Sequence, residues 1–182
     1  MTDQIQVFTQ SSIRISGGPG VLYLDPIGIP GAPHDADFIL ITHDHGDHFS
    51  PEDIRKLAGP KTVLVVPEKM ARQARSLTEE PGAVETVRPG QRRTLGALTF
   101  ETVLAYNRVK PFHPKSAGWV GYLLEVDGRR IYVAGDTDLT PENRALRCDV
   151  ALVPIGGTFT MDPKKAAELI NAMSPAVAIP TH

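Results

Sequence analysis

Cysteine is nearly absent from this sequence, with Cys148 as the single example in 182 residues. One thiol cannot close an internal disulfide, and it cannot build a zinc site from several cysteines. We therefore expect a fold that its hydrophobic core holds without cross-links. Any metal site has to use histidine and carboxylate ligands.

Long apolar runs are absent as well. A membrane-spanning helix requires about 18 consecutive apolar residues, and no stretch of this sequence approaches that length. Its N-terminus also lacks a basic segment followed by an apolar one. We therefore expect a cytoplasmic protein with no membrane partner.

An excess of one charge is the third feature that is missing. The 19 basic and 21 acidic residues leave a formal net charge of -2, which gives no field that would attract nucleic acid over the whole surface. A nucleic-acid partner is therefore not expected, whereas a small-molecule substrate is. The sequence leaves the oligomeric state open.

Hydrophobic residues make up 41% of the chain, and a chain of this length buries roughly 70% of its unfolded surface when it folds. We expect a single domain over residues 1–182. Apolar runs, turn residues and helix caps predict an opening β-meander, followed by further strands and helices. Strands are expected over residues 5–9, 12–16, 21–25, 37–42, 61–66, 84–87, 93–95, 98–105, 119–126, 129–134, 149–155 and 176–180, and helices over 51–58, 68–77 and 163–172.

The segment THDHGDH (residues 42–48) concentrates three imidazoles and two carboxylates. Such groups need solvent, a partner or a bound ion, so packing does not explain them. In an extended segment His43 and His45 point the same way and can bind one divalent ion, while the glycine turn directs Asp47 and His48 towards a second point. The spacing predicts a loop that serves two metals. A core or surface histidine is the alternative for any one of them taken alone.

The pattern His-x-His-x-Asp-His after an apolar run resembles the signature of the metallo-β-lactamase superfamily, a group of binuclear metal hydrolases. The resemblance implies an α/β fold, the αββα four-layer sandwich, with the metals at one edge where loops meet. The segments RIYVAGDTD, DVALVPIGGTFTMD and AIPTH are also similar to the branch that contains L-ascorbate-6-phosphate lactonase and other metal-dependent hydrolases. This second likeness spans roughly residues 20–182.

The resemblance implies three further ligands. His113 follows a predicted strand and lies 23 residues before Asp136 (136 minus 113), about the separation of the superfamily's third histidine from its bridging acid. Asp136 stands beside a glycine at a strand end, and the last predicted strand delivers His182. One metal site would consist of His43, His45 and His113, the other of Asp47, His48 and His182, with Asp136 bridging the two.

These residues would bind two divalent ions, with zinc as the expected metal and manganese or iron as alternatives, because imidazole and carboxylate suit all three. A hydroxide between metals roughly 3.5–4 Å apart would be the nucleophile. Two carboxylates and a hydroxide cancel three of the four metal charges, so the remaining charge favours an anionic substrate. Asp47 and Asp136 are the catalytic residues of this hypothesis. Asp47 could also pass a proton to the leaving group, although metal binding alone would explain it.

We therefore predict a binuclear metal-dependent hydrolase of a small anionic ester or lactone. A carboxylate rather than a thiolate at the bridge argues against a true β-lactamase. A phosphodiesterase or nuclease of the ribonuclease Z type is the alternative, but it would usually need a clamping arm or a basic face. A non-enzymatic metal-containing binding protein is a third hypothesis, which the complete ligand set argues against. Arg108, Lys110 and Lys115 could receive an anionic group or be solvated surface charges.

Three other residues keep two interpretations each. Asp25 either hydrogen-bonds to the metal-binding loop, as an acid at this place does in the superfamily, or forms a turn before Pro26. Asp138 either supports the site or caps a helix. His34 is expected in a surface loop, with a contact at the rim of the site as the alternative.

His182 is the last residue of the sequence, whereas in the relatives more chain follows the final histidine. A free chain end must lose conformational freedom to bind. We expect that strand pairing of residues 177–180 holds His182, and that its metal site is the weaker and more open one. The terminal carboxylate could join or replace the imidazole, and a natural chain that continues past His182 is the other explanation.

Overall fold

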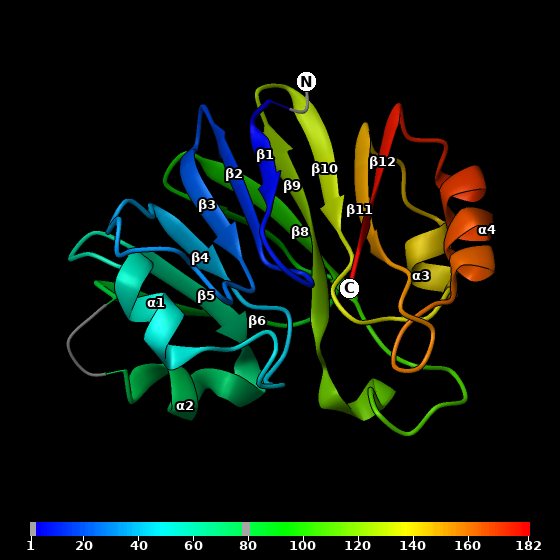
Figure 1. Cartoon of the computed structure of the whole chain (residues 1–182), viewed down its shortest axis with the longest axis horizontal. Helices are drawn as coiled ribbons and strands as arrows, with labels where there is room; N and C mark the ends of the chain where they lie inside the picture. Colours follow the sequence, from blue (N-terminus) through cyan, green and yellow to red (C-terminus); the bar gives the residue numbers. More distant parts are fainter. Residues whose placement is uncertain (1–2, 78–80) are drawn as a thin grey trace. The chain divides into compact units, whose positions relative to one another are not determined.

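The computed structural model describes residues 3–77 and 81–182. It divides the chain into two compact units, one up to Val87 and one from Arg88 onwards. Each unit contains a six-stranded sheet and helices. Figure 1 labels most of these elements along the ribbon. Each sheet begins with antiparallel strands and ends with parallel ones.

The sheet of the first unit opens with the predicted meander. β1 pairs with β2 and β2 with β3 in antiparallel fashion, and β3 to β6 are then parallel neighbours. Parallel neighbours need a crossover connection, and the helices of this unit lie in two of these crossovers. The strands are β1 (Ile5–Val7), β2 (Ile13–Gly17), β3 (Gly20–Leu24), β4 (Phe38–Leu40), β5 (Val63–Pro67) and β6 (Ala83–Val87).

The first helix begins where the sequence predicts it. In α1 (Pro51–Leu57), the side chain of Ser50 caps the helix by accepting a hydrogen bond from the Asp53 N–H at 3.1 Å. The next predicted helix is shorter than expected. It starts as a 3₁₀ turn, η1 (Glu68–Met70), and continues as α2 (Ala71–Arg75) without a side-chain cap. The segment begins at the predicted residue and ends two residues before the predicted end.

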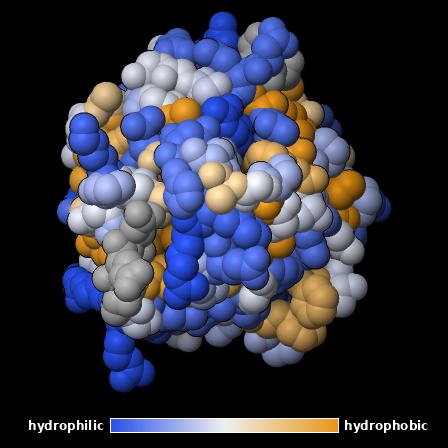
Figure 2. All heavy atoms as spheres, turned by 60° about the vertical axis from the view of Figure 1, so that its left-hand side comes forward, coloured by the Kyte–Doolittle hydropathy of each residue, from blue (hydrophilic) through white to orange (hydrophobic). Residues whose placement is uncertain are grey.

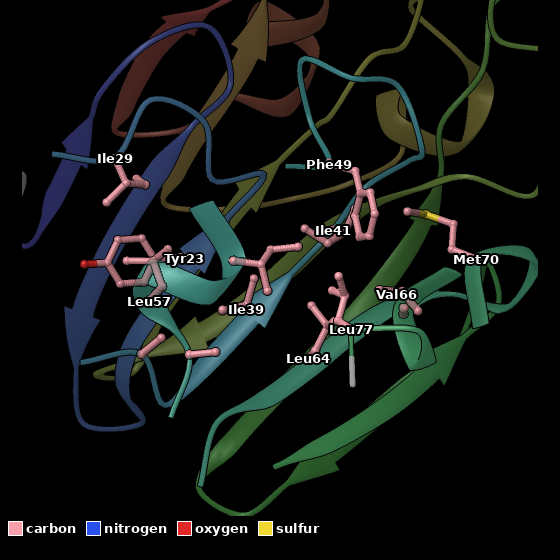
Figure 3. Packing of buried hydrophobic residues seen from close by; sticks show 14 residues of the cluster. Tyr23, Ile29, Ile39, Ile41, Phe49, Leu57, Leu64, Val66, Met70 and Leu77 are labelled. Carbon is pink, nitrogen blue, oxygen red and sulfur yellow. The ribbon is translucent and has the colours of Figure 1, made fainter. Parts of the chain in front are cut away.

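The hydrophobic core of the first unit combines strand and helix side chains. Ile39, Leu64 and Val66 come from the sheet, Leu57 from α1 and Met70 from η1, and Figure 3 shows them gathered together. Each is at most 1% exposed. Burying a side chain of this size stabilises the fold by about 1.5–3 kcal/mol. This core therefore fixes the end of β4, from which the residues predicted to bind metal emerge.

The sheet of the second unit has the order β12-β11-β10-β9-β8-β7. Strands β7 to β10 are antiparallel neighbours, and β10, β11 and β12 are parallel. Asp127 and Gly128, with φ of 50° and 74°, form the tight turn between β9 and β10. The strands are β7 (Arg92–Leu95), β8 (Leu98–Leu104), β9 (Val120–Val126), β10 (Arg129–Val133), β11 (Val150–Pro154) and β12 (Val177–Thr181).

The helices of the second unit include one that the sequence did not predict. The expected helix α4 (Pro163–Met173) is capped by Asp162, and its Leu169 and Met173 enter the core of this unit. The unexpected one is α3 (Pro141–Arg144), a single turn that Thr140 and Asn143 cap reciprocally. One turn is too short to show a hydrophobic period, so only its caps could have revealed it. A short 3₁₀ turn, η2 (Lys115–Ala117), was also not predicted.

Hydrophilic residues predominate on the face drawn in Figure 2, and hydrophobic ones lie among them in small groups. None of the helices in the described part of the chain has the length and apolar character needed to cross a membrane.

Candidate metal centre

Two neighbouring strands of the first unit deliver its polar groups to one edge of the sheet. Leu24 ends β3 and Leu40 ends β4, and the two are partners in a parallel pair. The next residue after β3, Asp25, donates its backbone N–H to the carbonyl of Leu40 at 3.1 Å. The carboxyl ends of parallel strands are the usual place for sites in α/β sheets. Residues 42–48, called the ligand loop from here on, leave the sheet beside Asp25.

The hydrophobic core holds the ligand loop at both ends. Ile41 precedes it with no exposed surface, and Phe49 follows it with 4% of its surface exposed. Within the loop, the backbone N–H groups of His48 and Phe49 donate to the carbonyl of His45 at 3.0 and 2.9 Å. This turn brings the His48 ring back to within 4.0 Å of the His43 ring, measured between centroids.

Asp25 is fully buried and organises the ligand loop. Its Oδ1 accepts the Thr42 N–H at 2.8 Å, and its Oδ2 accepts the Thr42 hydroxyl at 2.6 Å and Nδ1 of His48 at 2.8 Å. Because the Thr42 hydroxyl donates to Asp25, its oxygen accepts from Nδ1 of His43, 2.9 Å away. Nδ1 is therefore the protonated nitrogen in both rings, which leaves Nε2 for a metal. The predicted hydrogen bonding between Asp25 and the loop of residues 42–48 is confirmed.

The four predicted ligands of the first unit differ in exposure. His43 and His48 are buried, whereas His45 and Asp47 are partly exposed. The rings of His43 and His45 lie 4.7 Å apart, and Oδ2 of Asp47 lies 3.8 Å from Nε2 of His48. One ligand atom each from Asp25, His43 and His48 lies within 4.8 Å of the others. The ligand loop and Asp25 therefore bring imidazole nitrogens and carboxylate oxygens close together.

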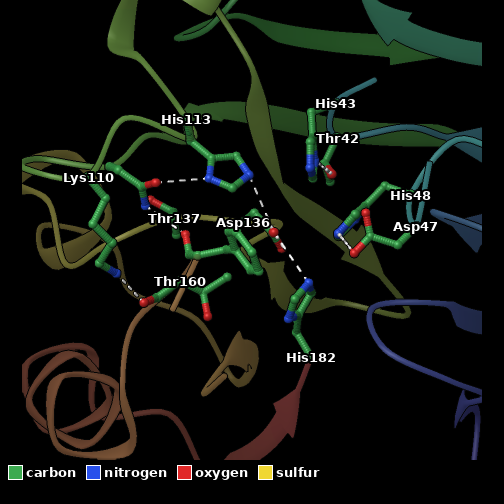
Figure 4. A network of polar contacts seen from close by, with 12 residues as sticks. Thr42, His43, Asp47, His48, Lys110, His113, Asp136, Thr137, Thr160 and His182 are labelled. Carbon is green, nitrogen blue, oxygen red and sulfur yellow. Dashed lines mark hydrogen bonds and ion pairs between the residues drawn. The ribbon is translucent and has the colours of Figure 1, made fainter. Parts of the chain in front are cut away.

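The second unit also brings its three predicted ligands together. His113 follows β8, Asp136 follows β10 and His182 follows β12. The carboxylate Oδ2 of Asp136 lies 3.4 Å from Nε2 of His113 and 3.4 Å from Nε2 of His182, and dashed lines mark both contacts in Figure 4. Asp136 is 3% exposed and His113 1% exposed. One buried carboxylate oxygen thus faces two imidazole nitrogens.

Asn107 fixes the ring of His113, a role that the sequence did not suggest. Its Nδ2 donates to the carbonyl of Phe159 at 2.9 Å, so its Oδ1 is directed at Nδ1 of His113, also at 2.9 Å. Its backbone N–H donates to the His113 carbonyl at 2.8 Å. Nδ1 of His113 therefore carries the proton, and Nε2 is the atom that faces Asp136.

Gly156 makes room for His182. A Cβ atom at position 156 would lie 2.8 Å from the His182 carbonyl oxygen and 3.2 Å from its Nδ1. Side chains do not approach backbone this closely, so a larger residue would displace the histidine. The pairing of β12 with β11, in which Thr181 is the partner of Pro154, places the next residues of the two strands side by side. As expected, His182 is held by strand pairing, with 12% of its side chain exposed.

Two of the three cations considered for anion binding have acidic partners within the second unit. Lys110 Nζ donates to Asp138 at 2.7 Å and also to the carbonyl of Thr160. Lys115 Nζ lies 3.0 Å from Glu142. Burial raises the pKa of Glu142, but hydrogen bonds from Lys115 and other groups outweigh it and hold that pKa below its usual value.

Asp138 supports the loop that carries His113, which agrees with the first of its two interpretations. Besides Lys110, it accepts the backbone N–H of Arg108 at 2.9 Å. The capping interpretation is wrong, because Thr140 is the N-cap of the following helix. The segment before His113 is therefore tied to the segment after Asp136.

Two residues stay outside the candidate centre. His34 is exposed, and its Nδ1 lies 2.9 Å from the carbonyl of Ala58, as suits the predicted surface loop. Cys148 is partly buried, and burial raises the pKa of its thiol to about 11. Among the described residues, Cys148 belongs to none of the groups of side chains that could hold a metal ion. The candidate donors are therefore imidazoles and carboxylates alone.

The donor set fits a divalent metal. Nε2 of His113 bears a lone pair when the ring is neutral, because Nδ1 carries the proton, and it faces a carboxylate oxygen 3.4 Å away. Two acceptors at this distance repel each other unless a proton or a cation lies between them. Imidazole nitrogen together with carboxylate oxygen is a donor set that suits zinc, manganese and iron.

The comparisons with known proteins concern nearly the whole chain. The model of the β-lactamase superfamily domain matches residues 4–182. A metal-dependent hydrolase of Thermococcus onnurineus is 32% identical over an alignment that covers 98% of this chain and 84% of the relative. One from Nitratidesulfovibrio vulgaris is 35% identical, with 92% of this chain and 74% of the relative covered.

The solved structures agree with the sequence relatives. A candidate metal-dependent hydrolase from Parabacteroides distasonis has a TM-score of 0.83 and 29% identity, over 97% of this chain and 80% of that one. The predicted α/β fold of the metallo-β-lactamase type is confirmed. The chain therefore belongs to the metallo-β-lactamase superfamily, and it is a metal-dependent hydrolase.

Proposed function

We propose that this chain is a binuclear hydrolase of small anionic esters or lactones, folded as one domain over residues 1–182. The proposal assigns seven ligands to two divalent ions, with zinc first and manganese or iron as alternatives. One ion is held by His43, His45 and His113, the other by Asp47, His48 and His182, and Asp136 is shared. The relatives are metal-dependent hydrolases by name, and their names give no substrate.

One observation carries the binuclear part of the proposal. Oδ2 of Asp136 lies 3.4 Å from Nε2 of both His113 and His182, which the proposal assigns to different metals. A carboxylate needs this position to bridge two ions. The tautomer of His113 supports the same assignment, because Asn107 leaves its Nε2 as the ligand atom.

The residues of this chain would bind the two metals and orient the ligand rings. Two bound divalent ions would lower the pKa of water to about 7 and stabilise the oxyanion that develops on the substrate. Asp25 and Asn107 hold the ligand histidines with Nε2 outward. Asp47 has 42% of its side chain exposed, so it could also hold a proton for the leaving group.

The charge balance supports an anionic substrate. Asp47 and Asp136 are the two carboxylates among the seven proposed ligands, and with a hydroxide they cancel three of the four metal charges. The positive charge that remains favours an anionic group in the substrate or in the transition state. The similarity to the branch that contains L-ascorbate-6-phosphate lactonase supports a lactone or ester, and this closer likeness stays a prediction.

Two measurements test the proposal. Elemental analysis of the chain reconstituted with zinc or manganese should give two equivalents of metal, and one equivalent or none would contradict it. The reconstituted enzyme is then screened with lactones, carboxylic and thiol esters, and phosphodiesters. We expect turnover of small anionic lactones or esters. Faster cleavage of RNA would show that the ribonuclease Z type of activity is the correct one.

A further inference from the structure

A cavity of about 410 Å³ lies in the second unit, outside the seven proposed ligands. Three short segments and the first turn of α4 form its walls. Its volume falls within the roughly 300–1,000 Å³ of small-molecule sites. The lining residues are Arg108, Val109, Lys110, Asp138, Leu139, Gly157, Met161, Asp162 and Lys165.

The cavity offers an apolar surface. Met161 is 1% exposed and Leu139 is partly buried, and both belong to the packing of this unit. Val109, in contrast, is 91% exposed, the largest value among the large hydrophobic residues that the structure describes. An exposed valine beside a cavity gains burial when an apolar group enters, which favours a ligand with a hydrocarbon part.

The charges around the cavity are mostly neutralised. Lys110 pairs with Asp138 at 2.7 Å, and Lys165 pairs with Glu168 at 2.8 Å. Asp162 accepts the backbone N–H of Lys165 at 2.8 Å as the cap of α4. Each of these groups already has a function in the fold.

Arg108 is the exception. Its backbone N–H donates to Asp138, but its guanidinium makes no hydrogen bond or ion pair with any residue in the described ranges 3–77 and 81–182. A guanidinium presents several N–H donors in a plane and suits a carboxylate or a phosphate. The cavity therefore combines an apolar lining with one available cation.

We propose that this cavity binds a small anion with an apolar chain. Arg108 pairs with the carboxylate or phosphate head group, and Val109, Leu139 and Met161 contact the chain. The walls continue directly into the proposed metal ligands, since Lys110 lies three residues before His113 and Asp138 two residues after Asp136. If the proposed hydrolase function is correct, the cavity holds the part of the substrate that does not react.

The test measures binding directly, and so it does not depend on turnover. Methyl groups of the chain of residues 1–182 are followed by NMR during titration with hexanoate, hexyl phosphate, hexanol and acetate. The titration is done both on metal-loaded protein and on protein treated with a chelator. We expect hexanoate or hexyl phosphate to shift the methyl signals of Val109, Leu139 and Met161, with a Kd of about 1 mM. Hexanol and acetate should each bind roughly tenfold more weakly.

Variants assign the binding to this cavity. Arg108→Gln should reduce the affinity for hexanoate to that for hexanol, roughly tenfold weaker. Val109→Ser should weaken hexanoate binding while leaving acetate binding unchanged, and it changes an exposed side chain that the fold does not need. The control is Arg147→Gln, an exposed arginine of the same unit that does not line the cavity.

The outcomes separate this proposal from the hydrolase proposal. Equal affinity for hexanol and hexanoate, an unchanged Arg108→Gln variant, or shifts confined to other methyl groups would each overturn it. Tighter binding of hexyl phosphate than of hexanoate would identify a phosphate as the head group. Tighter binding of hexanoate would identify a carboxylate. Binding by the chelator-treated protein supports the cavity even if the chain proves inactive on every ester and lactone.

Discussion

The two units differ in how the chain assembles their candidate ligands. In the first unit, Asp25 and the ligand loop follow the neighbouring parallel strands β3 and β4. In the second unit, Asp136 and His182 follow β10 and β12, which flank β11 in the parallel part of the sheet, whereas His113 follows β8, whose neighbours are antiparallel. The first unit collects four candidate ligands in one seven-residue loop. The three candidate ligands of the second unit come from separate segments, and the first of them, His113, lies 69 residues before the last, His182 (182 minus 113).

This difference has a physical consequence. In the first unit a single buried carboxylate, Asp25, orients two imidazole rings. It contacts His48 directly and His43 through the Thr42 hydroxyl. In the second unit each ligand has its own support, Asn107 for His113 and the space at Gly156 for His182. Changing one support should therefore affect two histidines in the first unit, but only one in the second.

The largest effect is expected from the ligand that both proposed metals share. Asp136→Asn removes a negative charge but almost no volume, so the fold should remain while hydrolysis falls by roughly 10²–10³-fold or more. Turnover of the best substrate from the screen measures the loss of hydrolysis. Circular dichroism measures whether the fold remains. Near-normal turnover would show that Asp136 is not the bridge.

The next effect concerns the most exposed histidine of the second unit. His182→Ala should leave a folded protein in which one of two metals binds at least roughly 100-fold more weakly, because a ligand is lost. Competition with a chelator measures both affinities. His34→Ala, which removes an exposed histidine outside the candidate centre, is the matched control. If both affinities are unchanged in His182→Ala, this residue is not a ligand.

The comparison of supports is tested by two nearly isosteric changes. Asp25→Asn replaces one acceptor oxygen by an NH₂ group that must face a donor, so it should misorient both His43 and His48 and weaken both metals by roughly 10–100-fold. Asn107→Leu should weaken only one metal, by a similar factor. Asp44→Asn, an exposed position in the ligand loop, is the control. Equal patterns for the two variants would contradict the distinction between shared and separate supports.

The smallest effect is on stability and depends on pH. Burial raises the pKa of Asp53, but hydrogen bonds from Lys56, Ser50 and the N–H groups of Gly28 and Ile29 outweigh it and hold that pKa below 3.8. The ionised group therefore stabilises the fold at pH values above 3.8, and this contribution is lost as the pH falls through the folded pKa.

Asp53→Asn should lower the Tm by roughly 2–4 °C at pH 7. The difference from the unmodified chain should shrink towards pH 3, and calorimetry at several pH values measures it. Glu52→Gln removes the neighbouring, exposed carboxylate and serves as the control. A Tm difference that grows on acidification would refute the assignment.

Local patterns made part of this molecule predictable. The ligand loop is contiguous, so its spacing showed the donors, and the apolar run before it showed the strand that delivers them. The candidate ligands of the second unit were predicted through the resemblance to a family. His113 and Asp136 are 23 residues apart, so no local sequence pattern contains both. The assignment of all seven residues as ligands stays a prediction.

Other features depend on contacts that no local pattern encodes. Asn107 is a carboxamide in a loop, and its function follows from the Phe159 carbonyl, 52 residues away in sequence. The pairing of Lys110 with Asp138 likewise joins residues 28 apart, so only the fold could show which cations are neutralised. A carboxamide six residues before a candidate histidine is a weak signal, and a search for such pairs would have found this one.

Asp25 also bears on how the metal sites would fill. It supports His43 and His48, which the proposal assigns to different ions, through hydrogen bonds that share one carboxylate oxygen. An ion bound at either histidine restrains Thr42 and Asp25, so the other histidine is already ordered when the second ion arrives. The two ions should therefore bind cooperatively. By reciprocity, whichever enters first favours the other by the same factor.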